Sequence, residues 1–101
     1  MARCPKTAAE AFKRLDKRLS EEDKKAIRDA ESMIEFHFSL GMWIRNYWIH
    51  TGEKENLAML MRDMGEDVIT IGEGDDMIYL LEPDGASQTI LEAYQKHLKE
   101  K

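Results

Sequence analysis

The stretch from Met33 to Gly52, MIEFHFSLGMWIRNYWIHTG, decides the fold. Drawn as a helix at about 100° per residue, it is apolar around most of its circumference and leaves only a narrow polar arc. A helix with so little polar surface belongs in the middle of a fold. We therefore expect a central apolar helix over residues 32–49, with Gly52 just past its end as the stop signal.

Two further helices are expected on the N-terminal side of this stretch. Thr7 followed by Glu10 has the spacing of a capping box, which predicts a helix that runs to about Leu19. Ser20 with Asp23 gives a second N-cap pattern and predicts a short helix that leads into the central one. The first helix carries one apolar stripe, so it buries one face and leaves the other to solvent. The second has little apolar content, and we expect it to lie across the end of the first.

The C-terminal side combines helices with a hairpin. Helical spacing predicts a methionine-rich helix over residues 56–64, ended by Gly65, and a last helix over residues 86–99, capped by Asp84. Between them, two β-prone runs separated by GEGDD predict a β-hairpin over residues 67–81. Two strands alone are marginal in water, so the hairpin must pack on the helices or add to a sheet in another copy of the chain.

These elements define the expected architecture. We expect an α+β fold, mainly α, with about five helices around the central apolar helix and one hairpin. At 101 residues, with 43% hydrophobic and 35% charged residues, the composition is that of an ordinary globular protein. We therefore expect residues 1–101 to form a single domain.

Composition also bears on the compartment. The N-terminus has no apolar region of secretory length, and the central stretch is too interrupted by polar residues to span a membrane. We expect neither a signal peptide nor a membrane partner. The single cysteine, Cys4, cannot form an intramolecular disulfide, and we expect it in a loose N-terminus, which favours a reducing, cytoplasmic location.

Charge is distributed unevenly along the chain. Residues 1–28 hold nine Lys and Arg against five Asp and Glu, a net +4, whereas the remainder holds six against fifteen, a net −9. A basic end can bind nucleic acid, but no interleaved aromatic residues or recognition-helix pattern accompany it. We instead expect a basic helix near an acidic surface of the same or a neighbouring chain, with nucleic acid an unlikely partner.

One candidate binding site lies within the central stretch. His37, Gly41 and Arg45 follow one another at four-residue spacing, so a notch at Gly41 would lie between an imidazole and a guanidinium, with Trp48 as an apolar wall. Arg45 could bind two oxygens of a small anion or carboxylate there. The alternative, which the rule that buried charges are paired favours, is that Arg45 pairs with a carboxylate of the first two helices or the hairpin, while His37 bonds a backbone carbonyl.

Signals for other chemistry are weak. The acidic residues around the hairpin lack the spacing of an EF-hand loop, and the three histidines have no zinc-binding relation to one another. The chain contains no P-loop, dinucleotide-binding glycine motif or nucleophile elbow. We therefore expect no metal, no cofactor and no enzymatic activity. The acidic residues in question are Glu73, Asp75, Asp76, Glu82 and Asp84.

Four segments carry a family resemblance: PKTAAEA at residues 5–11, LSEEDK at 19–24, FHFSLGMWIRN at 36–46 and PDGAS at 83–87. With these segments the chain resembles a family of small, uncharacterised bacterial proteins with a domain of unknown function. The resemblance implies a bacterial, mainly helical protein and supplies no activity. The resemblance also implies a shorter segment between residue 64 and Pro83 than this chain has, so the hairpin could be an insertion.

The functional expectation follows from what is present and what is lacking. An acidic surface, a hairpin with exposed edges and the lack of a catalytic motif favour a small interaction domain, accessory or immunity-type, whose partner is another protein or a second copy of itself. The alternative is a module that binds a small anion or carboxylate in the notch at Gly41.

Overall fold

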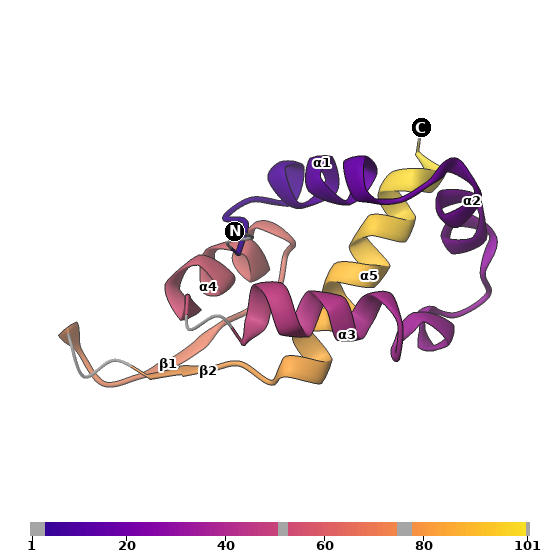
Figure 1. Ribbon diagram of the computed structural model, residues 1–101. Helices are drawn as coiled ribbons and strands as arrows, with labels where there is room; N and C mark the ends of the chain where they lie inside the picture. Colours follow the sequence, from indigo (N-terminus) through magenta and orange to yellow (C-terminus); the bar gives the residue numbers. More distant parts are fainter. Residues whose placement is uncertain (1–3, 51–52, 75–77, 101) are drawn as a thin grey trace.

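The computed structural model describes residues 4–50, 53–74 and 78–100. Over these residues the chain is mainly helical with one two-stranded antiparallel hairpin, which confirms the expected α+β class. Its long dimension, 44 Å, is well above the other two, 27 and 24 Å. The hairpin lies at one end of this long shape and α2 at the other (Figure 1).

The first two helices begin where the capping patterns predicted. In α1 (Ala8–Arg18) the Thr7 side chain accepts a hydrogen bond from the Glu10 amide at 3.2 Å. In α2 (Glu21–Asp29) the Ser20 hydroxyl accepts from the Asp23 amide at 3.1 Å. Each side chain satisfies one of the amides that the first turn of a helix leaves free.

The prediction of one continuous helix over residues 32–49 is wrong. The stretch forms a 3₁₀ turn η1 (Met33–Phe36), a short helix α3 (Leu40–Ile44) and a π-helical turn η2 (Arg45–Ile49), with a break at residues 37–39. Ser39 leaves helical geometry, with φ −107° and ψ −92°, and its hydroxyl bonds the Phe36 carbonyl at 3.4 Å. Serine side chains that bond nearby backbone groups compete with a helix in this way.

The C-terminal half contains α4 (Lys54–Asp63), β1 (Ile69–Ile71), β2 (Ile78–Leu80) and α5 (Pro83–Lys99). Gly65 has φ +89°, the left-handed conformation expected of a residue that ends a helix. The hairpin falls within the predicted range. The last helix begins three residues earlier than predicted, because Pro83 occupies its first turn, where a missing amide hydrogen does no harm.

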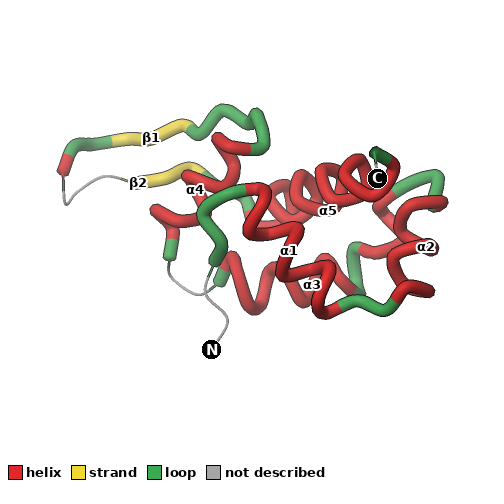
Figure 2. Tube along the Cα trace, turned by 90° about the horizontal axis from the view of Figure 1, so that it is seen from above, coloured by secondary structure: helices red, strands yellow, loops and turns green. Residues whose placement is uncertain are grey.

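The core lies where α5 crosses the other helices. Helix α5 contacts α2, η1, α3 and η2, so it shares the central position that the sequence assigned to residues 32–49 alone (Figure 1). Seen from above, the hairpin extends away from this helical body (Figure 2). Large, fully buried side chains from several elements meet in the core, among them Leu15, Ile27, Ile44, Trp48, Leu57, Leu60, Ile90 and Tyr94.

Cys4 does not lie in a loose segment as expected. Its side chain is 2% exposed and belongs to the core. Its amide donates to a Glu53 carboxylate oxygen at 3.2 Å, and the Asn56 side chain donates to its carbonyl at 3.5 Å. Backbone contacts to the start of α4 therefore hold this part of the N-terminus against the helical body.

Candidate functional site

The Arg45 cluster, formed by Arg45, His37, Gly41, Asp84 and Ser87, joins the central stretch to the start of α5. The guanidinium donates from Nη2 to the His37 carbonyl at 2.8 Å and from Nη1 to the Ser87 hydroxyl at 2.9 Å. Its Nε lies 3.6 Å from an Asp84 carboxylate oxygen. The His37 carbonyl belongs to the helix break, so Arg45 supplies a donor where the backbone ladder is interrupted.

The notch expected at Gly41 is filled from within the chain. A Cβ at this position would lie 3.2 Å from Arg45 Nη1 and 3.2 Å from the Phe36 carbonyl oxygen. Glycine at this position therefore leaves room for the guanidinium and for the Phe36 carbonyl. His37 Nδ1 lies 3.4 Å from the same Nη1. With Arg45 only 9% exposed, the cluster presents little of its guanidinium to solvent.

Three of the four predicted site residues come together, and the fourth lies elsewhere. Arg45 lies against both His37 and Gly41, whereas Trp48 is fully buried with its ring packed edge-on against Trp43 at 5.4 Å between centroids. The carboxylate that pairs with Arg45 comes from α5, an element that neither interpretation of the sequence had named.

Sequence reasoning missed Asp84 and Ser87 as members of the cluster. Ser87 is fully buried, and its hydroxyl also donates to the Asp84 carbonyl at 3.0 Å. The available signal was a serine on the apolar side of the last helix, one turn after an aspartate. A fully buried hydroxyl needs a partner, so that position could have directed the search for one.

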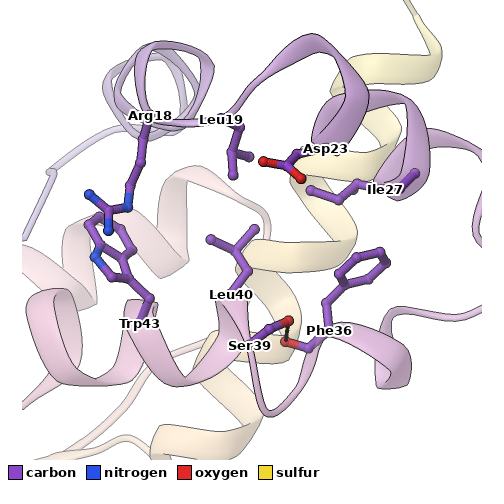
Figure 3. Close-up of a pocket in the computed structure, with 9 residues that line it drawn as sticks. Arg18, Leu19, Asp23, Ile27, Phe36, Ser39, Leu40 and Trp43 are labelled. Atoms are coloured by element: carbon purple, nitrogen blue, oxygen red, sulfur yellow. Dashed lines mark hydrogen bonds between the residues drawn. The ribbon is translucent and has the colours of Figure 1, made fainter.

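A separate pocket opens between α1, α2, η1 and α3 (Figure 3). We call it the α1–α3 pocket; its volume is about 280 Å³. The guanidinium of Arg18 lies over the Trp43 ring, 4.4 Å from the centroid, and forms one side of the rim. Polar lining comes from Arg18, Asp23 and Ser39, and apolar lining from Leu19, Ala26, Ile27, Phe36, Leu40 and Trp43.

The hairpin presents an unusual apolar surface. Its register pairs Ile69 with Leu80 and Ile71 with Ile78, so all four side chains lie on the same face. Each is more than half exposed, between 51% and 62%. We call these four residues the hairpin face. The strands are anchored at their base, where the adjoining Val68 and Leu81 pack against the core.

Two buried ionisable groups lie outside these surfaces. Burial, reinforced by the negative charge of Glu53, raises the pKa of the Cys4 thiol to about 12. Burial also raises the pKa of Tyr94, whose hydroxyl donates to an Asp16 carboxylate oxygen at 2.8 Å. Both groups are therefore neutral near pH 7. The contacts of Cys4 join the segment before α1 to the start of α4, and the contact of Tyr94 joins α5 to α1.

The described ranges give no sign of a metal centre or a membrane segment. No group of three or more His, Cys, Asp and Glu side chains there is placed to hold a metal ion. Two residues of the acidic cluster, Asp75 and Asp76, lie outside the described residues. None of the described helices has both the length and the apolar character that a membrane crossing requires.

Comparison with known families gives one result. The model of a domain of unknown function, DUF6794, matches residues 4–98. The chain belongs to this family. No curated protein and no solved structure matches it.

The DUF6794 match contains both segments that build the Arg45 cluster. FHFSLGMWIRN supplies His37, Gly41 and Arg45, and PDGAS supplies Asp84 and Ser87. The two segments are far apart in sequence, and the contacts of Arg45 bring them together. The hairpin also falls within the matched range.

Proposed function

We propose that this chain is a bacterial, cytoplasmic interaction domain, accessory or immunity-type, that binds a partner protein through the hairpin face and acts by contact rather than by catalysis. The observation that carries the proposal is the exposure of four aliphatic side chains on one face of a projecting hairpin. Apolar residues gathered in this way on a folded domain are typical of an interaction site. The family resemblance supports a bacterial origin, and a lone cysteine supports a reducing compartment.

The charge of the hairpin region defines the partner further. Residues 65–84 include seven Asp and Glu and no Lys, Arg or His. A surface that covers the hairpin face must therefore combine an apolar centre with basic residues around it, because like charges would oppose the contact. Strand edges on both sides of the two-stranded sheet also allow a partner to add a strand.

The alternative, a carboxylate site in the notch at Gly41, has less support from the geometry. The guanidinium that would bind the ligand already donates to the His37 carbonyl and the Ser87 hydroxyl. A ligand would have to displace these contacts before it could use the same donors. We therefore propose an architectural role for the Arg45 cluster.

The test compares three forms of the tagged chain expressed in its native host. The double variant Ile71→Ser/Leu80→Ser removes half of the hairpin face, and Thr70→Ala changes an exposed residue on the opposite face of the same hairpin. A protein captured by the wild type and by Thr70→Ala, but not by the double variant, is then purified. Its affinity is measured by calorimetry with each form.

We expect the double variant to bind the purified partner about tenfold more weakly or worse, and Thr70→Ala to bind as the wild type does. Glu73→Lys should also weaken the complex and reduce its dependence on salt. If every captured protein binds the double variant as tightly as the wild type, the proposal is wrong. Unfolding curves of all forms verify that the substitutions leave the fold intact.

A further inference from the structure

The α1–α3 pocket and the hairpin face are complementary surfaces of one molecule. The pocket has a mainly apolar lining, with the Arg18 guanidinium fixed over Trp43 at its rim. The hairpin offers aliphatic side chains of a size that enters such a pocket, flanked by acidic residues. Arg18 and Asp23 lie on opposite sides of Leu19 (Figure 3). Because Asp23 would repel acidic residues, the acidic flank of a docked hairpin would lie on the Arg18 side.

The two surfaces cannot meet within one chain. The hairpin projects from one end of the molecule, while the pocket lies toward the opposite end, between the last turn of α1 and α2 (Figures 1 and 2). Lys24 and Arg28 of α2 pair with carboxylates of their own helix, Glu21 and Asp29. Arg18 has no carboxylate partner among the described residues and contacts the Trp43 ring instead.

We propose that the hairpin face of one copy docks into the α1–α3 pocket of a second copy, in a head-to-tail contact. This inference rests on the proposed function, since it names the chain itself as a partner of the hairpin. Each copy then uses its hairpin on one neighbour and its pocket on another. Such a contact is heterologous, and it forms a ring if the rotation closes and a longer chain if it does not.

Charge favours this contact over a symmetric one. If two hairpin faces packed on each other, two regions that each carry seven acidic residues and no basic residue in sequence would be brought together, which like charges oppose. The pocket instead has the Arg18 guanidinium on one side and Asp23 on the other, so an acidic flank placed on the Arg18 side meets opposite charge (Figure 3). The opposed surfaces are small, which places the contact among weak interfaces that form at high protein concentration.

The first experiment is sedimentation velocity between about 10 µM and about 1 mM protein, a range that covers weak association. The wild type should form larger species as its concentration rises. Ile71→Ser/Leu80→Ser should remain monomeric, and so should Ala26→Glu, which places a bulky acidic side chain at an exposed position of the pocket lining. Ala9→Glu introduces the same change at an exposed position of α1 outside the pocket and should associate as the wild type does.

Mixing the two defective variants separates head-to-tail docking from symmetric pairing. Ala26→Glu retains its hairpin face and the double hairpin variant retains its pocket, so the mixture should form a complex of one copy of each and nothing larger. Symmetric pairing of hairpin faces predicts instead that Ala26→Glu associates alone and that mixing adds no complex. That result would overturn the proposal. Arg18→Glu serves as a second pocket variant, and each form is verified by its unfolding curve.

The outcomes distinguish this inference from the proposed function. A wild type that stays monomeric throughout the concentration range shows that self-docking is wrong, and it does not bear on binding of a different protein by the hairpin face. The captured proteins could instead bind the double variant as tightly as the wild type while head-to-tail association is observed. That result shows that the hairpin face binds a second copy of the chain and does not bind a different protein.

Discussion

Replacement of Arg45 by methionine tests whether the Arg45 cluster stabilises the fold or exists to bind a ligand. Methionine keeps much of the length and apolar stem of arginine, so the change removes the guanidinium with little loss of packing. The wild-type guanidinium makes two short hydrogen bonds, at 2.8 Å to the His37 carbonyl and at 2.9 Å to the Ser87 hydroxyl. Arg45→Met leaves both acceptors without this donor.

The expected magnitude follows from these contacts. A hydrogen bond from a charged group contributes about 1.5 kcal/mol or more, so the two bonds amount to about 3 kcal/mol. The Asp84 contact adds little, because it is 3.6 Å long and the Asp84 side chain is 65% exposed. We therefore expect Arg45→Met to lower the free energy of unfolding by about 3 kcal/mol, which corresponds to a fall of roughly 15 °C in Tm for a domain of this size.

The assay is urea denaturation at pH 7, followed by the fluorescence of Trp43 and Trp48. Arg18→Met is the matched control, because its guanidinium contacts only an aromatic ring among the described residues and should contribute about 0.5 to 1 kcal/mol. A double-mutant cycle of Arg45→Met with Ser87→Ala should show coupling between the two positions. If Arg45→Met changes the free energy of unfolding by less than about 0.5 kcal/mol, the architectural role is refuted and the ligand-binding alternative is favoured.

Three further predictions follow from buried positions. In an ordinary helix, Gly41→Ala would stabilise the fold by about 1 kcal/mol. Here it should instead destabilise by about that amount in the same assay, because its Cβ would lie 3.2 Å from both Arg45 and the Phe36 carbonyl. A more stable variant would contradict the packing described. Cys4, buried and with its pKa raised to about 12, should react with a disulfide reagent at pH 8 far more slowly in the native protein than in guanidinium chloride; equal rates would disprove its burial. Because the pKa of Tyr94 is higher in the folded than in the unfolded state, its contribution to stability is fully present below about pH 10 and is lost as pH rises through the folded pKa. Above about pH 10, the free energy of unfolding of Tyr94→Phe should therefore fall less steeply with pH than that of the wild type. Parallel plots of this free energy against pH would refute the raised pKa of Tyr94.

The parts of the fold that depend on neighbouring residues could be predicted from sequence. Thr7 and Ser20 cap their helices with side chains that bond amides three residues ahead, so the signal is complete within a few positions. The hairpin was predictable for the same reason, because β-prone runs and the glycines between them lie close together. Two of these glycines, Gly72 and Gly74, have φ of +94° and +58°, which other residues rarely adopt.

The break at residues 37–39 depends on distant partners and was not predictable from local pattern. A stretch that is apolar around most of its circumference predicts burial, but its pattern does not show whether the buried segment is one helix or several. The break exposes Phe38 at 79% and frees a carbonyl, and the donor for that carbonyl, Arg45, is fixed in turn by Ser87 on α5. Local rules fail where a polar group from a remote element completes the backbone.

The exposure of the hairpin face has a consequence for any complex it forms. Each of the four side chains still has about half of its surface to bury, so together they could contribute roughly 3 to 5 kcal/mol on contact. Loss of translational and rotational freedom opposes association by a similar or larger amount. The apolar contacts alone are therefore insufficient for a stable complex, and the acidic residues beside them must contribute through charge. A genuine partner of the hairpin, whether a second copy or another protein, is for this reason expected to bind more weakly as salt concentration rises, whereas nonspecific adhesion to the apolar face would grow stronger with a salting-out salt such as sulfate.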